Sequence, residues 1–211
     1  VRKDWPILSR VLDKAMKSVT RGELDELKRK WLSKKISQHK DRIGLSLEEH
    51  AWIANNPSLN VANELDWAPF DFALNGEPLG YSIDLIKLIA AKTGLSLKFI
   101  NGYSWDELVQ QFKQGKLDIM PAMMETEERK TFTRFTEAYF KNSLVLTIRE
   151  DTQDIKKLSD LKGRKLTLIK GYYYEESIKR LFPDIEVIGV SGFKAGLNAV
   201  LNGEADAFIG S

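Results

Sequence analysis

The chain of 211 residues contains no cysteine. Disulfide frameworks, thiolate metal sites and cysteine nucleophiles are therefore excluded, although a lack of cysteine does not identify a compartment. Histidine is almost as scarce, because only His39 and His50 occur, and both lie in a polar stretch. Two histidines placed in this way are too few for a catalytic or metal site built on imidazole, so we expect no metal and no cofactor.

Long apolar runs are also missing. No stretch approaches the roughly 18 to 20 apolar residues that a bilayer-spanning helix needs, and Val1 opens no signal-peptide pattern. We therefore expect any membrane anchor or leader to lie outside this chain. With 43% hydrophobic and 29% charged residues, the composition suits an ordered globular protein with one sizeable core or two small lobes.

No strong excess of one charge is present, because the formal net charge is only +2. The basic residues gather in the first 50 positions, but there the acidic residues from Glu23 to Glu26 alternate with the basic run Lys28 to Lys30. Such mixing is typical of a solvated helix face rather than of a nucleic-acid or membrane surface. We expect no nucleic-acid partner.

Two amphipathic helices are predicted near the start of the chain. Apolar residues recur at three- and four-residue spacing over residues 6–20, and Pro6 suits the first turn. Thr20 and Glu23 have capping-box spacing and open a second helix, which reaches residue 32. Each helix therefore has one apolar face that another element must cover.

A polar run between Ser33 and Arg42 follows these helices and predicts a linker. Ser46 and Glu49 then form a second capping-box pair, which predicts a short helix that ends near Pro57.

From Leu59 onward, short apolar runs alternate with amphipathic segments, which predicts an α/β fold with crossover connections. The predicted strands are residues 59–63, 96–100, 117–121, 143–149, 165–169, 185–189 and 206–209. The clearest predicted helices are residues 82–93, 105–114, 174–181 and 192–201.

An ordered series of motifs runs through residues 59–211. Its members are Trp67-Ala68-Pro69-Phe70, Gly80-Tyr81 with Asp84-Leu85, Gly115 to Asp118, Thr126 to Arg129, Phe135-Thr136 with Tyr139, and Gly203 to Gly210. No single motif is specific, and their order is the informative feature. The series resembles the periplasmic solute-binding proteins of the amino-acid type, family 3, which have the two-lobe Venus-flytrap fold (periplasmic binding protein type 2).

The resemblance implies a domain plan. Residues 59–141 would form lobe 1, residues 142–149 the hinge crossing, and residues 150–211 a partial lobe 2, because the family's chain continues past the position of Ser211 and returns to lobe 1. Residues 1–33 would be the last helices of a preceding flytrap domain, and residues 34–58 a linker with a short helix. This arrangement resembles tandem-flytrap sensor histidine kinases and diguanylate cyclases.

The resemblance also implies a site. In amino-acid binders of this family, the arginine of the Thr-x-x-Arg motif holds the ligand carboxylate, and Arg129 takes that position here. A guanidinium suits this role because its planar fork of donors matches a carboxylate and stays charged. The alternative for Arg129 is a surface ion pair with Glu125 or Glu128.

Three further candidates lie in the preceding loop. Trp67 stands where the family places an aromatic side chain over the ligand, and Phe70 follows it; core packing is the alternative for both. Glu64 stands where many relatives have an aspartate near the ligand, and simple solvation is its alternative.

Departures from the family pattern put a standard α-amino acid ligand in doubt. Ala122 and Met124 replace small hydroxyl residues, Tyr172 and Tyr173 stand in place of threonine or serine, and Ser211 occupies the place of an aspartate that receives the ligand ammonium. A pocket of this kind suits an aromatic or otherwise apolar carboxylate. Alternatively, the tyrosines pack between elements of lobe 2.

Three functions remain open. The first is the periplasmic ligand-binding domain of a transmembrane signalling receptor, joined to the membrane only by segments outside this chain and able to pair as a homodimer. The second is the binding component of an amino-acid ABC transporter, and the third is the non-catalytic domain of a lytic transglycosylase. The chain itself is not expected to be an enzyme, because the adjacent Glu127 and Glu128 point in different directions and form no general acid/base pair.

Overall fold

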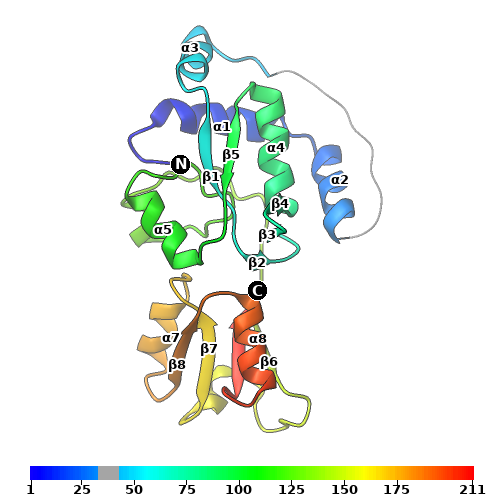
Figure 1. Ribbon diagram of the computed structural model, residues 1–211, viewed down its shortest axis with the longest axis vertical. Coiled ribbons are helices and arrows are strands. Elements are labelled where there is room, and N and C mark those ends of the chain that lie inside the picture. Colours follow the sequence, from blue (N-terminus) through cyan, green and yellow to red (C-terminus); the bar gives the residue numbers. More distant parts are fainter. Residues whose placement is uncertain (33–42) are drawn as a thin grey trace. The chain divides into compact units, whose positions relative to one another are not determined.

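The computed structural model describes residues 1–32 and 43–211 (Figure 1). The linker predicted between Ser33 and Arg42, with His39, lies outside the described residues. The chain divides into two units, each of which is described by itself. Unit 1 contains residues 1–103 and 110–138, and unit 2 contains residues 104–109 and 139–211.

A short parallel sheet forms the centre of unit 1. Strand β1 (Leu59–Ala62) pairs in parallel with β5 (Leu97–Ile100). On the other side of β1, Val61 makes a single parallel bridge with Ile119, and the amide of Ala62 donates to the Ile119 carbonyl at 2.9 Å. The apolar residues of β1 therefore belong to a strand that is buried along most of its length.

The prediction of a strand over residues 117–121 is therefore wrong, because only the bridge at Ile119 forms. The physical reason is the side chain of Asp118, whose Oδ2 accepts the backbone N–H of Asn60 at 2.8 Å. A continued ladder would need that donor for a backbone carbonyl. Pro121, which has no backbone N–H, follows directly.

An antiparallel hairpin sheet, which the sequence patterns did not predict, lies beside this core. It contains β2 (Asp66–Trp67), β3 (Asp71–Leu74) and β4 (Glu77–Leu79). Its signal was present in the sequence, because β3 and β4 are joined by Asn75 and Gly76, with φ of 52° and 82°. An Asn-Gly pair in this conformation is the preferred two-residue hairpin connection.

Asp71 ties this hairpin to the parallel sheet. Its Oδ1 accepts a hydrogen bond from Asn63 Nδ2 at 2.7 Å and another from the backbone N–H of Glu64 at 3.1 Å, both just beyond β1. Asn101, just beyond β5, donates in turn to Asn63 Oδ1 at 3.1 Å. Asp71 is only 1% exposed, and burial raises the pKa of its carboxyl to about 7.

Three helices at the start of the chain pack on the rest of unit 1. The helices α1 (Pro6–Ser18) and α2 (Arg21–Leu32) both contact α4 (Tyr81–Thr93), and α1 also contacts α3 (Leu47–Asn55), as Figure 1 shows. The prediction that the apolar face is covered is confirmed for α1, whereas Leu24, Leu27 and Trp31 on the apolar face of α2 are only half-buried. Leu8, Val11, Leu12 and Ala15 fill the buried side of α1.

Polar contacts fix the same helices. Both predicted capping boxes form, since Thr20 and Glu23 bond each other reciprocally, as do Ser46 and Glu49. Glu23 also pairs with Lys92 of α4 at 2.8 Å, and this lysine side chain is only 3% exposed. Farther along α2, Lys30 and the indole N–H of Trp31 both bond the Asp84 carboxylate.

Unit 2 contains one sheet with the strand order β6-β9-β7-β8. Strand β7 (Lys165–Ile169) is parallel to both β8 (Glu186–Val190) and β9 (Ala207–Gly210), and β6 (Val145–Ile148) is antiparallel to β9. Helix α8 (Phe193–Leu201) packs on this sheet, and the other helical segments are α7 (Glu175–Leu181) and a 3-10 turn (Leu158–Leu161).

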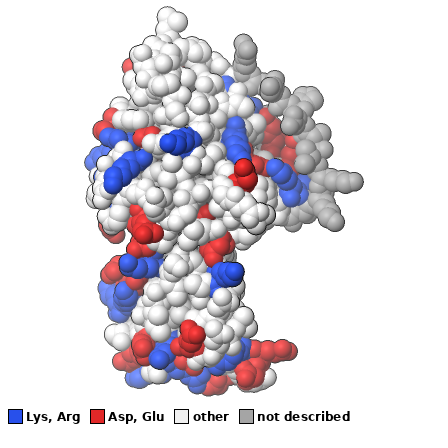
Figure 2. Space-filling view, in the orientation of Figure 1, with Lys and Arg blue, Asp and Glu red and all other residues white. Residues whose placement is uncertain are grey.

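Two further helices come from the middle of the chain. Helix α5 (Trp105–Lys113) begins in unit 2 and ends in unit 1, and the short α6 (Glu127–Lys130) belongs to unit 1. On the face shown in Figure 2, Lys and Arg side chains lie among Asp and Glu side chains.

Gly80 holds the loop after β2 against the start of α4. Its φ is +125°, and a Cβ there would lie 2.2 Å from the Phe70 carbonyl oxygen. The amides of Tyr81 and Ser82, at the start of the helix, donate to the carbonyls of Pro69 and Phe70, both at 2.9 Å. Only glycine permits this close approach.

We expect Gly80→Ala to lower the free energy of unfolding by at least about 3 kcal/mol, because backbone strain adds to the clash with Phe70. Gly94 is the matched control, since it ends the same helix with φ of +79°, but a Cβ there would have no neighbouring atom within 4 Å. Gly94→Ala should cost only about 1 to 2 kcal/mol. Urea unfolding of both variants measures the difference, and equal losses would contradict the close approach.

The Asp71 carboxyl predicts a specific pH dependence. Its folded pKa of about 7 lies above the ordinary value of 3.8, so between these values the folded state keeps a proton that the unfolded chain releases. Stability from this group is therefore present below about pH 4 and is lost as the pH rises through 7, by up to about 4 kcal/mol.

Asp71→Asn should remove this loss, because the amide oxygen still accepts from Asn63 and Glu64 while no charge forms. Unfolding by urea at a series of pH values should show that the free energy of unfolding of the variant rises relative to that of the wild type between pH 5 and 8. Asp25→Asn, at an exposed position of α2, is the control and should follow the wild-type profile. A constant difference for Asp71→Asn would show that its carboxyl does not titrate in this range.

Candidate functional site

The candidate residues of unit 1 gather at the carboxyl edge of its parallel strands. Glu64 follows β1, Asn101 follows β5, and the loop of residues 121–126 follows the bridge residue Ile119. Because β1, β5 and the bridge at Ile119 are parallel, these three segments leave the sheet at the same edge. Open α/β sheets bind ligands at this edge.

Arg129 is held inside the loop that leaves this edge. Thr126 caps α6 by accepting the backbone N–H of Arg129 at 3.2 Å, and the guanidinium donates from Nη1 to the Met124 carbonyl at 3.0 Å. Arg129 is only 7% exposed. A guanidinium presents its donors as a planar fork, which makes this group suited to a planar anion.

The acidic residues that offered an alternative for Arg129 are engaged by lysines. Glu125 pairs with Lys130 at 2.8 Å, and Glu128 pairs with Lys113 at 3.7 Å. Both carboxylates are exposed, unlike the arginine. A surface ion pair therefore does not account for the burial of Arg129.

The aromatic candidates lie in the loop that joins β2 to β3. The rings of Trp67 and Phe70 are 5.1 Å apart between centroids, and the Phe70 ring meets Tyr81 edge-on at 6.5 Å. Both side chains are buried, which agrees with the packing alternative, and their loop is fixed by Asp71 and Gly80. Glu64 is buried as well, which excludes its solvated alternative.

The two apolar candidates of unit 1 line the segment before Arg129. Ala122 is half-buried, and Met124 is 39% exposed even though its carbonyl accepts from the guanidinium. Exposure of an adaptable thioether next to a buried cation gives this loop both an apolar and a charged contact surface.

The candidates of unit 2 occupy the corresponding edge of their own sheet. The segment from Gly171 to Tyr174 follows β7, and Ser211 follows β9, which is parallel to β7. The Tyr172 ring meets Trp105 edge-on at 5.4 Å, and the indole N–H of Trp105 donates to the Gly171 carbonyl at 3.0 Å.

The tyrosines of this segment differ in their surroundings. Tyr172 and Tyr174 are buried, and the Tyr174 hydroxyl donates to the Ile209 carbonyl at 3.2 Å, so the packing alternative describes these two side chains. Tyr173 is half-buried against the Tyr174 ring, and Ser211 is also half-buried.

Sequence reasoning missed three residues that shape the edge in unit 1, namely Asn63, Asp71 and Asn101. Polar residues directly after two apolar strands, and an aspartate directly after Phe70, were the available signals. Within residues 1–32 and 43–211, no group of three or more metal-ligating side chains gathers, and no helix is long and apolar enough to cross a membrane.

Sensor proteins resemble this chain over nearly all of its length. The virulence sensor protein BvgS of Bordetella pertussis is 26% identical over 211 residues, which cover 99% of the chain and 17% of the relative. The sensor protein EvgS of Escherichia coli K12 is 27% identical over 212 residues, with the same two shares. The chain thus spans about a sixth of the length of these relatives.

A transport protein matches a shorter part. The ABC transporter arginine-binding protein 1 of Escherichia coli K12 is 27% identical over 154 residues, which cover 72% of the chain and 62% of the relative.

Solved structures agree with the sequence relatives. The crystal structure of the BvgS periplasmic domain superposes with a TM-score of 0.70 and 26% identity, covering 82% of this chain and 33% of that one. The predicted two-lobe periplasmic-binding-protein fold is therefore confirmed, as is the expected periplasmic class of domain. The family model of the bacterial extracellular solute-binding proteins, family 3, matches residues 59–202, and the chain belongs to this family.

Proposed function

We propose that this chain is the ligand-binding domain of a bacterial transmembrane signalling receptor and that Arg129 holds a carboxylate of its small-molecule ligand. The observation that carries the ligand-binding part is the burial of a guanidinium at the carboxyl edge of a parallel sheet, beside the exposed Met124. Solute binding without catalysis is the activity of the family to which the chain belongs.

The N-terminal helices favour a receptor over a transporter. The similarity to the two sensors continues through α1, α2 and α3, whereas the match to the arginine-binding protein covers only 72% of the chain. These helices are fastened to unit 1 by the buried pair of Glu23 and Lys92. Transport remains the second candidate, since that binding protein shares the family and fold.

The lobe boundaries belong to the same proposal. Lobe 1 would contain residues 59–141, lobe 2 residues 150–211, and residues 142–149 would form the hinge crossing. A transmembrane helix and a kinase or cyclase domain in the same gene would support the receptor, and a gene that ends with the binding domain beside a permease gene would support the transporter.

The ligand would be a carboxylate with an apolar body. Ala122 and Met124 offer apolar surface at the same edge as the Arg129 guanidinium, and the buried rings of Trp67 and Phe70 lie in the loop that Asp71 ties to this edge. An aromatic or aliphatic acid fits this set better than a small polar amino acid.

Replacing Arg129 tests the proposal. In the full periplasmic region of the parent protein, a thermal-shift screen of amino acids, dicarboxylates and aromatic acids first identifies the tightest ligand. Arg129→Ala should then weaken its binding at least roughly thirtyfold in calorimetric titration, because a buried charged hydrogen bond loses one partner. Arg129→Lys should also lose affinity, since an ammonium cannot reproduce the fork.

Arg180→Ala, at an exposed position on α7, is the matched control and should bind as the wild type does. Thermal unfolding without ligand separates lost binding from lost folding, and Arg129→Lys serves where the alanine variant is unstable. Binding within twofold of the wild type by a folded Arg129→Ala protein would show that Arg129 does not hold the ligand.

A further inference from the structure

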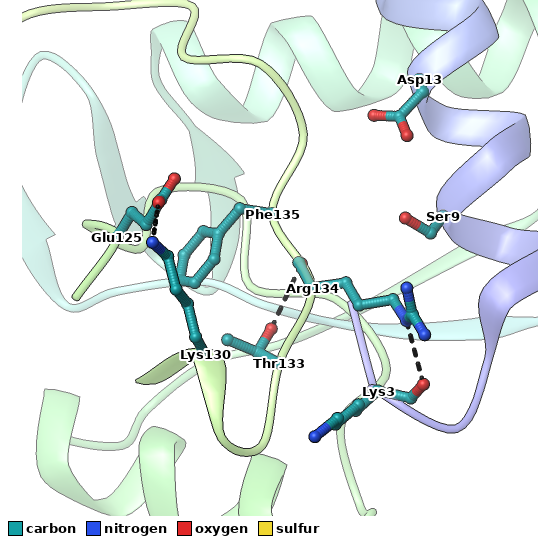
Figure 3. Close-up of a pocket in the computed structure, with 8 residues that line it drawn as sticks. All are labelled: Lys3, Ser9, Asp13, Glu125, Lys130, Thr133, Arg134 and Phe135. Carbon is teal, nitrogen blue, oxygen red and sulfur yellow. Dashed lines mark hydrogen bonds and ion pairs between the residues drawn. The ribbon is translucent and has the colours of Figure 1, made fainter. Parts of the chain in front are cut away.

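A pocket of about 470 Å³ opens on unit 1 between α1 and the segment of residues 125–135 (Figure 3). Its volume lies within the range of roughly 300 to 1,000 Å³ that is usual for small-molecule sites. The described residues that line it include none of the candidates for the site at Arg129. Helix α1 supplies one wall, and the loop that follows α6 supplies the other together with Lys3, which precedes α1.

One wall presents a carboxylate. Asp13 lies one helical turn after Ser9, so both side chains are on the same face of α1, and both point toward the loop in Figure 3. Within the described chain, Asp13 forms no ion pair and Ser9 forms no side-chain hydrogen bond. Burial raises the pKa of Asp13, an effect opposed by Lys17 and reinforced by Glu137.

The other wall presents two cations. The Arg134 side chain is oriented by a hydrogen bond from Nε to the Lys3 carbonyl at 3.1 Å, and its backbone N–H donates to the Val1 carbonyl at 2.8 Å. The two terminal nitrogens of Arg134 and the ammonium of Lys3 have no hydrogen-bond or ion-pair partner among the residues that the structure describes.

The remaining charges in the pocket neutralise each other. Lys130 pairs with Glu125 at 2.8 Å, as the dashed line in Figure 3 marks. Beside this pair, the ring of Phe135 is half-buried and supplies an apolar surface. The charges left for a ligand are therefore a carboxylate on one wall and a guanidinium with an ammonium on the other.

We propose that this pocket binds a small zwitterion, namely a molecule with one carboxylate, one ammonium and an apolar body. Arg134 and Lys3 receive the carboxylate, Asp13 and Ser9 receive the ammonium, and the apolar body lies against Phe135. A simple anion is disfavoured by Asp13, and a simple cation is disfavoured by Arg134 and Lys3. The site is separate from the one at Arg129 and does not depend on it.

L-leucine is a suitable probe, with two derivatives that each lack one charge. N-acetyl-L-leucine has no ammonium, and L-leucinamide has no carboxylate. In ¹⁵N–¹H spectra of the full periplasmic region, leucine should shift the amides of Ser9, Asp13, Arg134 and Phe135, and each derivative should bind at least tenfold more weakly there. Equal binding of all three, or no leucine-dependent shift at these amides, would overturn the proposal.

Two variants that each remove one charge test which wall of the pocket binds which charged group of the ligand. Asp13→Asn should weaken leucine at least tenfold but should spare N-acetyl-L-leucine, whereas Arg134→Gln should weaken leucine and spare L-leucinamide. Lys28→Gln, which removes a positive charge at an exposed position of α2, is the control and should leave all three affinities unchanged. Equal losses for both derivatives in either variant would contradict the assignment.

Arg129→Ala distinguishes the two sites. It should leave the leucine-dependent shifts around Asp13 and Arg134 in place, even where it abolishes binding of the ligand from the thermal-shift screen. Loss of the shifts at α1 in a folded Arg129→Ala protein would show one site instead of two.

Discussion

The buried carboxyl of Asp71 is the contact on which the candidate site of unit 1 depends. It accepts from Asn63 and from the backbone of Glu64, directly beyond β1, and it belongs to the hairpin whose loop carries Trp67 and Phe70. The aromatic loop therefore has a defined position relative to the carboxyl edge of the parallel sheet. Burial without a cationic partner raises the pKa of Asp71, so the same contact that orders the edge makes it sensitive to pH.

The position of Arg129 depends on a second local feature, the cap of helix α6. The Thr126 cap starts a helix of only one turn, and this turn directs the guanidinium back to the carbonyl of Met124. Glu125 and Glu128 pair with lysines, and the Arg129 guanidinium is positively charged at any relevant pH. An anionic ligand group at this place exchanges water for a fixed donor array, which is the usual basis of carboxylate recognition.

Local patterns were the most predictable part of the fold. The two capping boxes, at Thr20 and Ser46, follow from side-chain chemistry within four residues, and the helices and most strands follow from periodicity. The strand expected around Asp118 failed because its carboxylate takes the N–H of Asn60, a contact that spans 58 residues. The turn at Asn75 could have been predicted from the sequence. The burial of Asp71, in contrast, arises only when segments that are separate in the sequence come together in the fold. The same limit applies to the candidate site, because the order of residues in the sequence does not say which side chains surround a ligand.

We propose that Arg129 recognises a carboxylate, and a matched pair of ligands tests this recognition most directly. The measurement is calorimetric titration of the full periplasmic region with the acid selected by the thermal-shift screen and with its primary amide, in the wild type and in Arg129→Gln. Loss of the charged partner should make the amide at least roughly thirtyfold weaker in the wild type, and the two ligands should bind almost equally to the variant. Equal affinities in the wild type, or an unchanged preference for the acid in a folded Arg129→Gln protein, would contradict the account.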